Sequence, residues 1–369
     1  MSALAEVDGL PLTDRVGDVA AVRARFGARA PALIETTLLR RKAAAKLPGA
    51  DGWLFTDEAL QQATAAPVAA HRAGRLAGRA VHDVTCSIGA ELSALHRTAD
   101  PVLGSDLDPV RLAMARHNLP DVALCRADAL VPVTRDTVVV ADPARRSGGR
   151  RRFDPRDYTP GLDRLLDTYR HRDLVVKCAP GIDFEGLRRI GFDAEVEVVS
   201  WGGSVREACL WSPGLSEPGV TRRAVVLDRS EEVTDRDPDE GAVGPVGRWI
   251  VDPDGAVVRA GLVRQYATRH GLWQLDPDIA YLSGDQLPTG VRGFEVVDQL
   301  AYSEKRLREA LAARDCGTVE ILVRGVGVDP DALRRRLRLK GSSALSVVIT
   351  RLGTGPAARA EAFVCRPSR

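Results

Sequence analysis

Apolar and polar positions follow two different periodicities along this chain. From about residue 14 to residue 78, Ala, Leu and Arg recur at helical spacing, and the pattern stops at Pro48–Gly49 before it restarts at Thr56. The Thr56 hydroxyl can cap a helix whose first turn carries Asp57 and Glu58. The pattern therefore predicts a helical N-terminal segment.

Between about residues 80 and 212, short apolar runs alternate with helical patterns, which is typical of βαβ units in a parallel sheet. Only Trp201–Val205 separates the last two runs, which is too short for a crossover helix, so these runs should form a hairpin. We expect an α/β fold with a Rossmann-like, mostly parallel sheet that ends in this antiparallel hairpin. The predicted strands are Ala80–Val84, Pro101–Ser105, Val122–Leu124, Thr137–Ala141, Leu174–Lys177, Glu195–Ser200 and Glu207–Trp211.

The last part of the chain predicts a separate α+β domain. Its acidic stretch Ser230–Gly244 is interpreted as a solvated loop after the first strand of that domain. The further predicted elements are helices near Val258–His270 and Ser303–Arg314, a helix that opens at Asp329–Pro330, and strands at Thr318–Arg324, Ala344–Thr350 and Ala360–Cys365. These patterns divide the chain into segments 1–78, 79–218 and 219–369.

Composition excludes several classes of protein. The 369 residues include 52 Lys and Arg against 50 Asp and Glu, a net charge of +2, so any polyanion site must be a local patch. No apolar run approaches the ~18 to 20 residues of a membrane-spanning helix, and the acidic N-terminus is unlike a secretory signal. We expect a cytoplasmic protein without a membrane span. The six cysteines form no C-x-x-C pair, so neither a metal site nor a disulfide framework is expected.

Four carboxylates lie at the carboxyl ends of four successive predicted strands. Asp83 opens the turn Asp83–Glu91, in which small residues let a ligand approach the backbone. Asp106 follows the second strand, where an acidic side chain can accept both hydroxyls of a ribose. Asp128 and Asp142 follow the third and fourth strands. Because open α/β sheets bind ligands at the carboxyl ends of their strands, we expect these carboxylates to share one site.

In this order, the turn and the carboxylates resemble those of the class I S-adenosylmethionine-dependent methyltransferases, over about residues 56–212. The resemblance implies that S-adenosylmethionine is the cofactor. It also implies that the first turn approaches the methionine part, that the second acid holds the ribose and that the third acid meets the adenine. Thr85 and Ser87 stand where glycines are usual in that family. The cofactor-binding residues implied are Asp83, Thr85, Ser87, Gly89, Asp106 and Asp128.

A closer resemblance is to RNA base methyltransferases. The turn Asp83–Gly89 is similar to their D-x-x-C-G-x-G, and Asp142–Arg145 is similar to the D-P-P-R of uridine carbon-5 enzymes, with Ala144 in place of the second proline. Lys177–Pro180 resembles their S-C-N-P, whose cysteine attacks the uracil ring, and Glu207 stands where their proton-abstracting glutamate would lie. The catalytic residues implied are Asp142, Arg145, Cys178 and Glu207.

Two chemistries remain open on these residues. A pyrimidine carbon becomes nucleophilic only after a thiolate adds to the ring, and a base must then remove the ring proton, which would be the roles of Cys178 and Glu207. Alternatively, Cys178 is a small buried apolar residue, and the acceptor is a ring or exocyclic nitrogen. In that case Asp142 and the carbonyls beside it accept hydrogen bonds from the amine in the transition state.

Two basic clusters are candidates for RNA binding. The first follows Asp142 within Arg145–Arg152, and the second lies within Arg334–Lys340, after the helix start at Asp329–Pro330. With the strands that follow it, the second cluster resembles the THUMP-like C-terminal module of some bacterial methyltransferases. Because true THUMP domains dock tRNA, this resemblance implies an RNA substrate, although a charge run can also be only a solvated face. The RNA-binding residues implied are Arg146, Arg150, Arg151, Arg152, Arg334, Arg335, Arg338 and Lys340.

Together these features predict an S-adenosylmethionine-dependent methyltransferase that acts on a base in tRNA or rRNA. One alternative is a non-catalytic RNA-binding protein with a degenerate cofactor pocket, which the missing glycines favour. Another is a methyltransferase for a small molecule or a protein, because one fold serves many acceptors. A nicotinamide-dependent oxidoreductase would share the ribose acid but should carry G-x-G-x-x-G, of which only Gly89 is present.

Overall fold

The computed structural model describes residues 3–12, 16–144, 146–147, 150–151, 154–353, 355 and 358–368. The chain divides into two compact units. The first unit comprises Met1–Trp201 and Arg206–Pro218, and the second comprises Gly202–Val205 and Gly219–Arg369.

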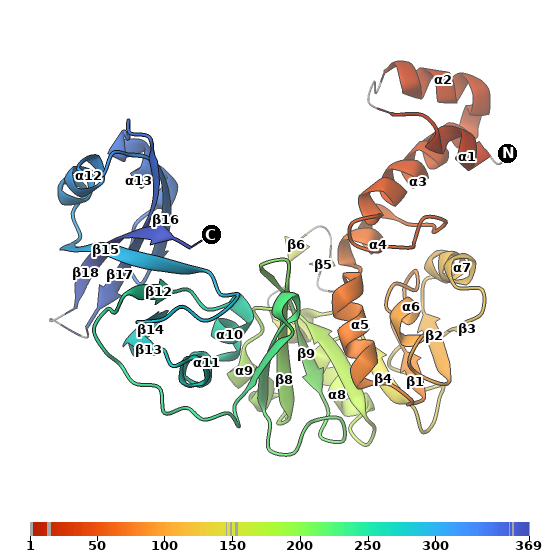
Figure 1. Ribbon diagram of the computed structural model, residues 1–369. Helices are drawn as coiled ribbons and strands as arrows, with labels where there is room; N and C mark the ends of the chain where they lie inside the picture. The colour runs from red at the N-terminus through yellow and green to blue at the C-terminus, as the bar shows by residue number, and fades with distance from the viewer. Residues whose placement is uncertain are drawn as a thin grey trace. The chain divides into compact units, whose positions relative to one another are not determined.

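Helices form the N-terminal segment of the first unit, as the sequence predicts (Figure 1). Helix α4 begins after Thr56, whose hydroxyl accepts a hydrogen bond from the amide of Ala59 at 3.1 Å. In α5, Val68, Ala69 and Ala73 are buried at helical spacing. The elements are α1 (Ala3–Asp8), α2 (Gly17–Phe26), the 3-10 helix η1 (Gly27–Arg29), α3 (Ala30–Ala43), α4 (Asp57–Gln62) and α5 (Ala66–Arg75).

The strands of the first unit lie in the order β8-β9-β7-β4-β1-β2-β3. Strands β1 to β4 and β7 pair in parallel, and β9 runs antiparallel to β7. Every residue of β4 and β7 is buried, so both strands are nearly unbroken apolar runs in the sequence. The expected fold class is confirmed, with the β8–β9 hairpin at the end of the parallel run. The bounds are β1 Val81–Asp83, β2 Val102–Asp106, β3 Ala123–Arg126, β4 Val138–Ala141, β7 Leu174–Cys178, β8 Glu195–Trp201 and β9 Ser204–Trp211.

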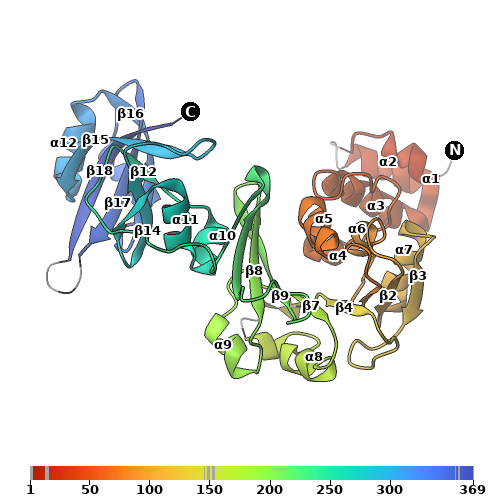
Figure 2. The ribbon, with the colours of Figure 1, turned by 60° about the horizontal axis from the view of Figure 1, so that its bottom comes forward.

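Helices cover both faces of this sheet. Figures 1 and 2 show α5 and α6 on one face, and α8 and α9 on the opposite face. The buried core between the sheet and α5 includes Leu76, Val140 and Trp211. The remaining elements are α6 (Leu92–Leu95), α7 (Pro109–Asn118), β5 (Arg146–Ser147), β6 (Arg150–Arg151), the 3-10 helix η2 (Pro155–Asp157), α8 (Leu162–Thr168) and α9 (Phe184–Arg189).

The second unit opens with an antiparallel pair that the sequence reading missed in part. Strand β10 (Arg222–Val226) pairs with β11 (Glu231–Thr234), and the 3-10 helix η3 (Leu227–Arg229) joins them. The prediction of a loop from Ser230 is therefore wrong over β11. Val233 is fully buried opposite Ala224, and the charged Glu232 beside it pairs with Arg223, so these acidic residues do not prevent a strand.

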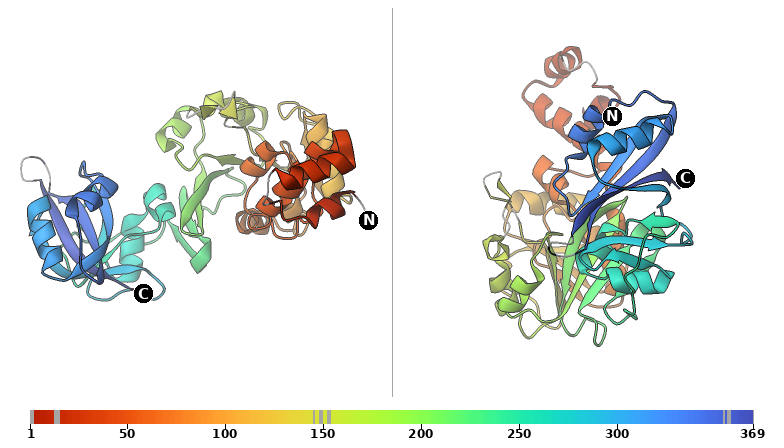
Figure 3. Two further views of the ribbon diagram at one scale, coloured as in Figure 1. Left: turned by 90° about the horizontal axis from the view of Figure 1, so that it is seen from above. Right: turned by 90° about the vertical axis from the view of Figure 1, so that its left-hand side faces the viewer.

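A second sheet dominates this unit, in the order β13-β14-β12-β15-β18-β17-β16. Helices α12 and α13 pack Leu307 and Leu333 into the core on one face, and α12 is the light-blue helix in Figure 3. The sequence predicts one helix over Val258–His270, but Gly261 ends α10 with a left-handed φ of 71° and α11 follows. The bounds are β12 Trp249–Val251, α10 Gly255–Ala260, α11 Val263–His270, β13 Trp273–Asp276, β14 Ile279–Gly284, β15 Gly293–Ala301, α12 Glu304–Ala312, β16 Cys316–Arg324, α13 Pro330–Leu337, β17 Ser343–Leu352 and β18 Arg359–Pro367.

Candidate functional site

A cavity of about 400 Å³ lies in the first unit at the carboxyl ends of β1, β2, β3, β4 and β7. This is the edge at which parallel α/β sheets bind ligands, and the volume falls in the usual range of ~300 to 1,000 Å³ for small-molecule sites. The four predicted carboxylates, Asp83, Asp106, Asp128 and Asp142, all line it. The structure thus brings together acids from the carboxyl ends of four separate strands.

The turn after β1 is held by its own side chains. The amide of Thr85 donates to the Asp83 carboxylate at 3.0 Å, and the amide of Ser87 donates to the Asp106 carboxylate at 2.9 Å. Ser87 adopts a left-handed φ of 50°, a conformation that glycine reaches more easily than any other residue. Gly89 has a φ of 90°, and a Cβ there would lie 2.8 Å from Leu119 Cδ1. This tight turn therefore requires its single glycine.

Asp106 and Asp128 are fixed in conformations that leave acceptor capacity. Asp106 Oδ1 accepts from the Asp108 amide at 2.9 Å, and Asp128 Oδ1 accepts from the Leu130 amide at 2.9 Å. Each carboxylate oxygen has about two lone-pair sites, so both side chains can still accept ligand donors. They line the cavity from neighbouring strands, β2 and β3.

One end of the cavity concentrates acidic groups around a buried arginine. Asp83 is 2% exposed, and Glu91 pairs with the Arg72 guanidinium at 2.5 Å. Burial, reinforced by the Glu91 carboxylate, raises the pKa of the Asp83 carboxyl to about 8, although the Thr85 amide opposes the shift. A cationic ligand group at this end would favour the ionised form of Asp83.

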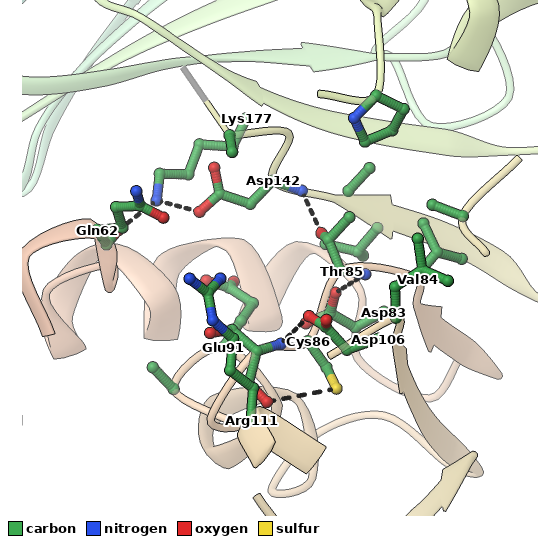
Figure 4. Close-up of a pocket in the computed structure, with 18 of the residues that line it drawn as sticks. Gln62, Asp83, Val84, Thr85, Cys86, Glu91, Asp106, Arg111, Asp142 and Lys177 are labelled. Atoms are coloured by element: carbon green, nitrogen blue, oxygen red, sulfur yellow. Dashed lines mark hydrogen bonds and ion pairs between the residues drawn. The ribbon is translucent and has the colours of Figure 1, made fainter. Parts of the chain in front are cut away.

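Asp142 and Lys177 form the other end, and Figure 4 shows their side chains pointing toward one another. Lys177 Nζ donates to Asp142 Oδ2 at 2.5 Å and to the carbonyl of Gln62 at 3.1 Å, and Lys177 is 6% exposed. The amide of Asp142 donates to Thr85 Oγ1 at 2.6 Å, which ties this strand end to the first turn. Ala144, Thr159, Pro160 and Arg164 also line the cavity.

Cys178 and Glu207 do not lie where the carbon-5 chemistry would need them. Neither lines the cavity, and they are 0% and 2% exposed. Successive side chains of a strand point to opposite faces, so Lys177 reaches the cavity and the Cys178 thiol points away from it. The Glu207 carboxylate accepts a hydrogen bond from Arg72, which keeps it in the interior. The structure departs here from the expected nucleophile and base.

Sequence reasoning missed several cavity residues. Gln62 and Thr64, at the end of α4 and after it, line the cavity, although the sequence analysis assigned them no role at a site. Arg72 and Glu91 also line it, and so does Lys177, although the motif Lys177–Pro180 pointed to Cys178 as the reactive residue. A signal was present for Arg72, because an arginine stands in the otherwise apolar stripe of α5.

The first basic cluster is described only in part. Arg145 and Arg152 lie outside the described residues. Arg146 pairs with Arg151, and Ser147 pairs with Arg150, in the backbone of the β5–β6 hairpin, which follows β4 and Asp142 in the chain. The hairpin thus places Arg146, Arg150 and Arg151 on two short strands that follow Asp142 closely in sequence.

The second basic cluster lies at the end of α13. The Arg334 guanidinium donates to the carbonyl of Val319 and pairs with Asp331. Arg335, Arg338 and Lys340 are exposed, and their side chains make no hydrogen bond or ion pair with the described residues. Three cations of this cluster are therefore available to a ligand.

The described residues hold neither a cluster of metal ligands nor a membrane-spanning helix. No group of three or more His, Cys, Asp or Glu side chains in that part of the chain could hold a metal ion. Among the same residues, no helix is long and apolar enough to cross a membrane.

Comparisons with known proteins agree with this geometry. A family model described as THUMP domain-like matches residues 291–367. Two Mycobacterium tuberculosis proteins, from different strains and named uncharacterized S-adenosylmethionine-dependent methyltransferases, are 67% identical over 358 residues, which is 94% of this chain and 100% of each relative. The crystal structure of a proposed methyltransferase from Porphyromonas gingivalis is 18% identical, with a TM-score of 0.75 over 92% of this chain and 91% of that one. The chain therefore belongs to the S-adenosylmethionine-dependent methyltransferases and carries a THUMP-like domain in its C-terminal region.

Proposed function

We propose that this methyltransferase modifies a base of structured RNA, either tRNA or rRNA. The observation that carries the proposal is the THUMP-like region, in which Arg335, Arg338 and Lys340 are exposed and unpaired among the described residues. Cations of this kind contribute the phosphate contacts that dominate affinity for nucleic acids. The same chain supplies the methyltransferase cavity, so RNA docking and methyl transfer would be properties of one protein.

The cavity residues suit S-adenosylmethionine. We assign the Asp106 carboxylate to the ribose hydroxyls, and the Asp128 side chain to the adenine, since both keep free acceptor sites. Asp83 and the turn residues Thr85 and Ser87 are assigned to the methionine part, because the acidic end of the cavity favours its cationic groups. Gly89 does not line the cavity, and we assign it the role of shaping this turn. The buried Arg72 guanidinium is a further candidate there, for the methionine carboxylate.

Asp142 and Lys177 form one end of the cavity, which we call the acceptor end. The residues of this end support methyl transfer to a nitrogen atom. The cofactor supplies a methyl group whose bond to sulfur breaks, and the electron pair of that bond stays on sulfur. Asp142 would hold the acceptor N–H group and remove its proton, because its carboxylate lines the cavity. Transfer to a pyrimidine carbon would need a cysteine at this end, and Cys178 does not line it.

A methyl-transfer assay tests the proposed function. The full-length protein would be incubated with S-adenosylmethionine carrying a tritiated methyl group and with RNA isolated from cells that lack the protein. We expect tritium in the tRNA or rRNA fraction, and none when the Asp142→Ala variant replaces the wild type. Tritium that appears only in the small-molecule or protein fraction would contradict an RNA substrate.

A further inference from the structure

Lys177 and Asp142 lie side by side at the acceptor end of the cavity, and each has hydrogen-bonding capacity left for a ligand. An ammonium group has three N–H donors, and the described residues occupy two donors of Lys177, through Asp142 Oδ2 and the Gln62 carbonyl. Asp142 Oδ1 accepts no hydrogen bond from a described residue, and the Asp142 side chain is 35% exposed. One N–H of Lys177 and one carboxylate oxygen of Asp142 therefore have no partner among the described residues, and Figure 4 shows the two side chains next to each other.

We propose that the methyl acceptor is a ring nitrogen of a lactam, the N–H next to a carbonyl that guanine and uracil carry. The lactam N–H would donate to Asp142, and the adjacent carbonyl would accept from Lys177. The inference rests on the proposed function, and it narrows the RNA substrate to nucleotides with this edge.

The positive charge of Lys177 favours a lactam nitrogen over an amino group as the methyl acceptor. An exocyclic amine gains positive charge as its nitrogen bonds to the methyl carbon, and a neighbouring ammonium such as Lys177 would oppose that charge. A lactam nitrogen becomes nucleophilic when it loses its proton, and the resulting anion is stabilised by the same ammonium. The ion pair between Lys177 and Asp142 therefore suits an acidic N–H better than an amine.

The transfer balances without a further reactant. The lactam proton passes to the Asp142 carboxylate, and the nitrogen lone pair forms the new N–C bond. The bond from the methyl carbon to the cofactor sulfur breaks, and its electrons remain on sulfur as a neutral thioether. Lys177 keeps its three protons throughout, so it acts by charge and hydrogen bonding.

The surroundings of the pair add positive charge at this end. Arg164 lines the cavity from α8, is exposed and makes no hydrogen bond or ion pair with the described residues, so it can meet a phosphate of the nucleotide. Lys46 donates to the carbonyls at the end of α4, and burial, together with the charge of Lys177, lowers the pKa of Lys46 to about 8. The other charged groups that line the cavity are Arg72, Asp83, Glu91, Asp106, Arg111 and Asp128, and the charges of Lys42 and Arg206 also act on Lys46.

The position of the methyl group tests the proposal on the wild-type protein. RNA methylated by the full chain would be hydrolysed to nucleosides and analysed by mass spectrometry. We expect the new product to be 1-methylguanosine or 3-methyluridine. A methyl group on an exocyclic amine or on pyrimidine carbon 5 would overturn the lactam proposal and leave the RNA methyltransferase proposal standing. The absence of any new methylated nucleoside in RNA would overturn both.

A binding experiment without turnover isolates the role of Lys177. Thio analogues of the lactam nucleotides, 4-thiouridine and 6-thioguanosine monophosphates, change their ultraviolet absorption when they lose the ring proton. In the presence of S-adenosylhomocysteine, the wild type should lower the pKa of the bound analogue by about one unit or more, because an adjacent cation favours the anion. Lys177→Met should abolish this shift, and Lys177→Arg should restore it in part.

Lys42→Met is the matched control, because Lys42 is exposed and pairs with Asp57 outside the cavity. This control should retain the full shift of the wild type. Thermal melting and S-adenosylhomocysteine affinity establish that each variant is folded. The proposal would be overturned if the wild type left the pKa of the analogue unchanged, and an analogue that does not bind counts as this result. It would also be overturned if Lys177→Met shifted the pKa as much as the wild type does. The product analysis on the wild type stands if Lys177→Met does not fold.

Discussion

At Cys178, the direction of one side chain decides between two chemistries. The sequence placed a thiol beside a lysine at the end of β7, and only the strand geometry shows that the lysine faces the cavity. A pattern of residues cannot determine which of two neighbours at a strand end points inward, because a shift of one residue exchanges the two faces. The carboxylates Asp106 and Asp142 could be predicted, because their position past a strand end suffices to bring them to the rim.

The first prediction concerns Cys178→Ala. Because the thiol is buried and does not line the cavity, we expect this variant to keep wild-type turnover and cofactor affinity, with a loss of about 1 kcal/mol in the free energy of unfolding. Single-turnover assays and chemical denaturation measure these quantities. A folded variant that binds the cofactor but has no activity would restore the carbon-5 chemistry.

At the scale of elements, helix α5 is held to the β8–β9 hairpin by buried charges. Arg75 pairs with Glu195 at 2.6 Å and with Glu197 at 2.7 Å, and His71 lies 3.0 Å from Glu197. Such long-range pairs could not be predicted, because nothing in the local pattern joins residues more than 100 positions apart. They account for the partly buried polar side chains between this helix and the sheet, and Arg72 on the same helix is held by Glu91 and Glu207.

The second prediction is the acid sensitivity of this contact. Burial alone would raise the pKa of Glu197, but His71 and Arg75 outweigh it and lower the pKa from 4.5 to about 2. The folded protein therefore holds Glu197 ionised where the unfolded chain binds a proton, so stability falls as the pH drops from about 4.5 toward 2. Between pH 5 and pH 3, the free energy of unfolding should fall more steeply for the wild type than for Glu197→Gln.

The control for this experiment is Glu185→Gln, because Glu185 is an exposed carboxylate of α9 with no ion pair among the described residues. Its pH dependence should follow that of the wild type. Equal slopes for the wild type and Glu197→Gln would show that the ion pairs of α5 do not stabilise the folded protein.

At the scale of the whole molecule, the N-terminal segment belongs to the catalytic unit. The Asn118 side chain bonds the backbone of Leu54 and of Ile88, so the segment is joined to the turn that follows β1. The residues after α4 then close one wall of the cavity. Helical periodicity predicted these helices, but their place in the cavity depends on tertiary contacts. Strand β15 was not predicted, because most of its residues are half-buried and it lacks an apolar run that would identify it as a strand.

The third prediction tests whether the THUMP-like region binds RNA. A triple change of Arg335, Arg338 and Lys340 to Ala should weaken RNA binding. It should also reduce the slope of log K against log salt concentration by about 2, since each lost phosphate contact reduces this slope by ~0.7 to 0.9. Affinity for S-adenosylmethionine should not change. Filter binding at several salt concentrations measures the slope.

The matched control changes three other exposed arginines of the same unit to Ala. These arginines, Arg248, Arg292 and Arg366, already pair with carboxylates. This control should keep the wild-type salt slope to within about 1 unit. If both triple variants lose the same affinity and slope, general positive charge and not the α13 cluster would explain the binding.

The most direct test of the account is calorimetric titration of S-adenosylmethionine into the wild type and Asp106→Ala. The Asp106 carboxylate is assigned to the ribose hydroxyls, and hydrogen bonds to a charged group contribute about 1.5 to 3 kcal/mol, so affinity should fall about tenfold or more. Asp121→Ala, at an exposed carboxylate outside the cavity, should bind as the wild type does. An unchanged dissociation constant in a folded Asp106→Ala protein would contradict the placement of the cofactor in this cavity.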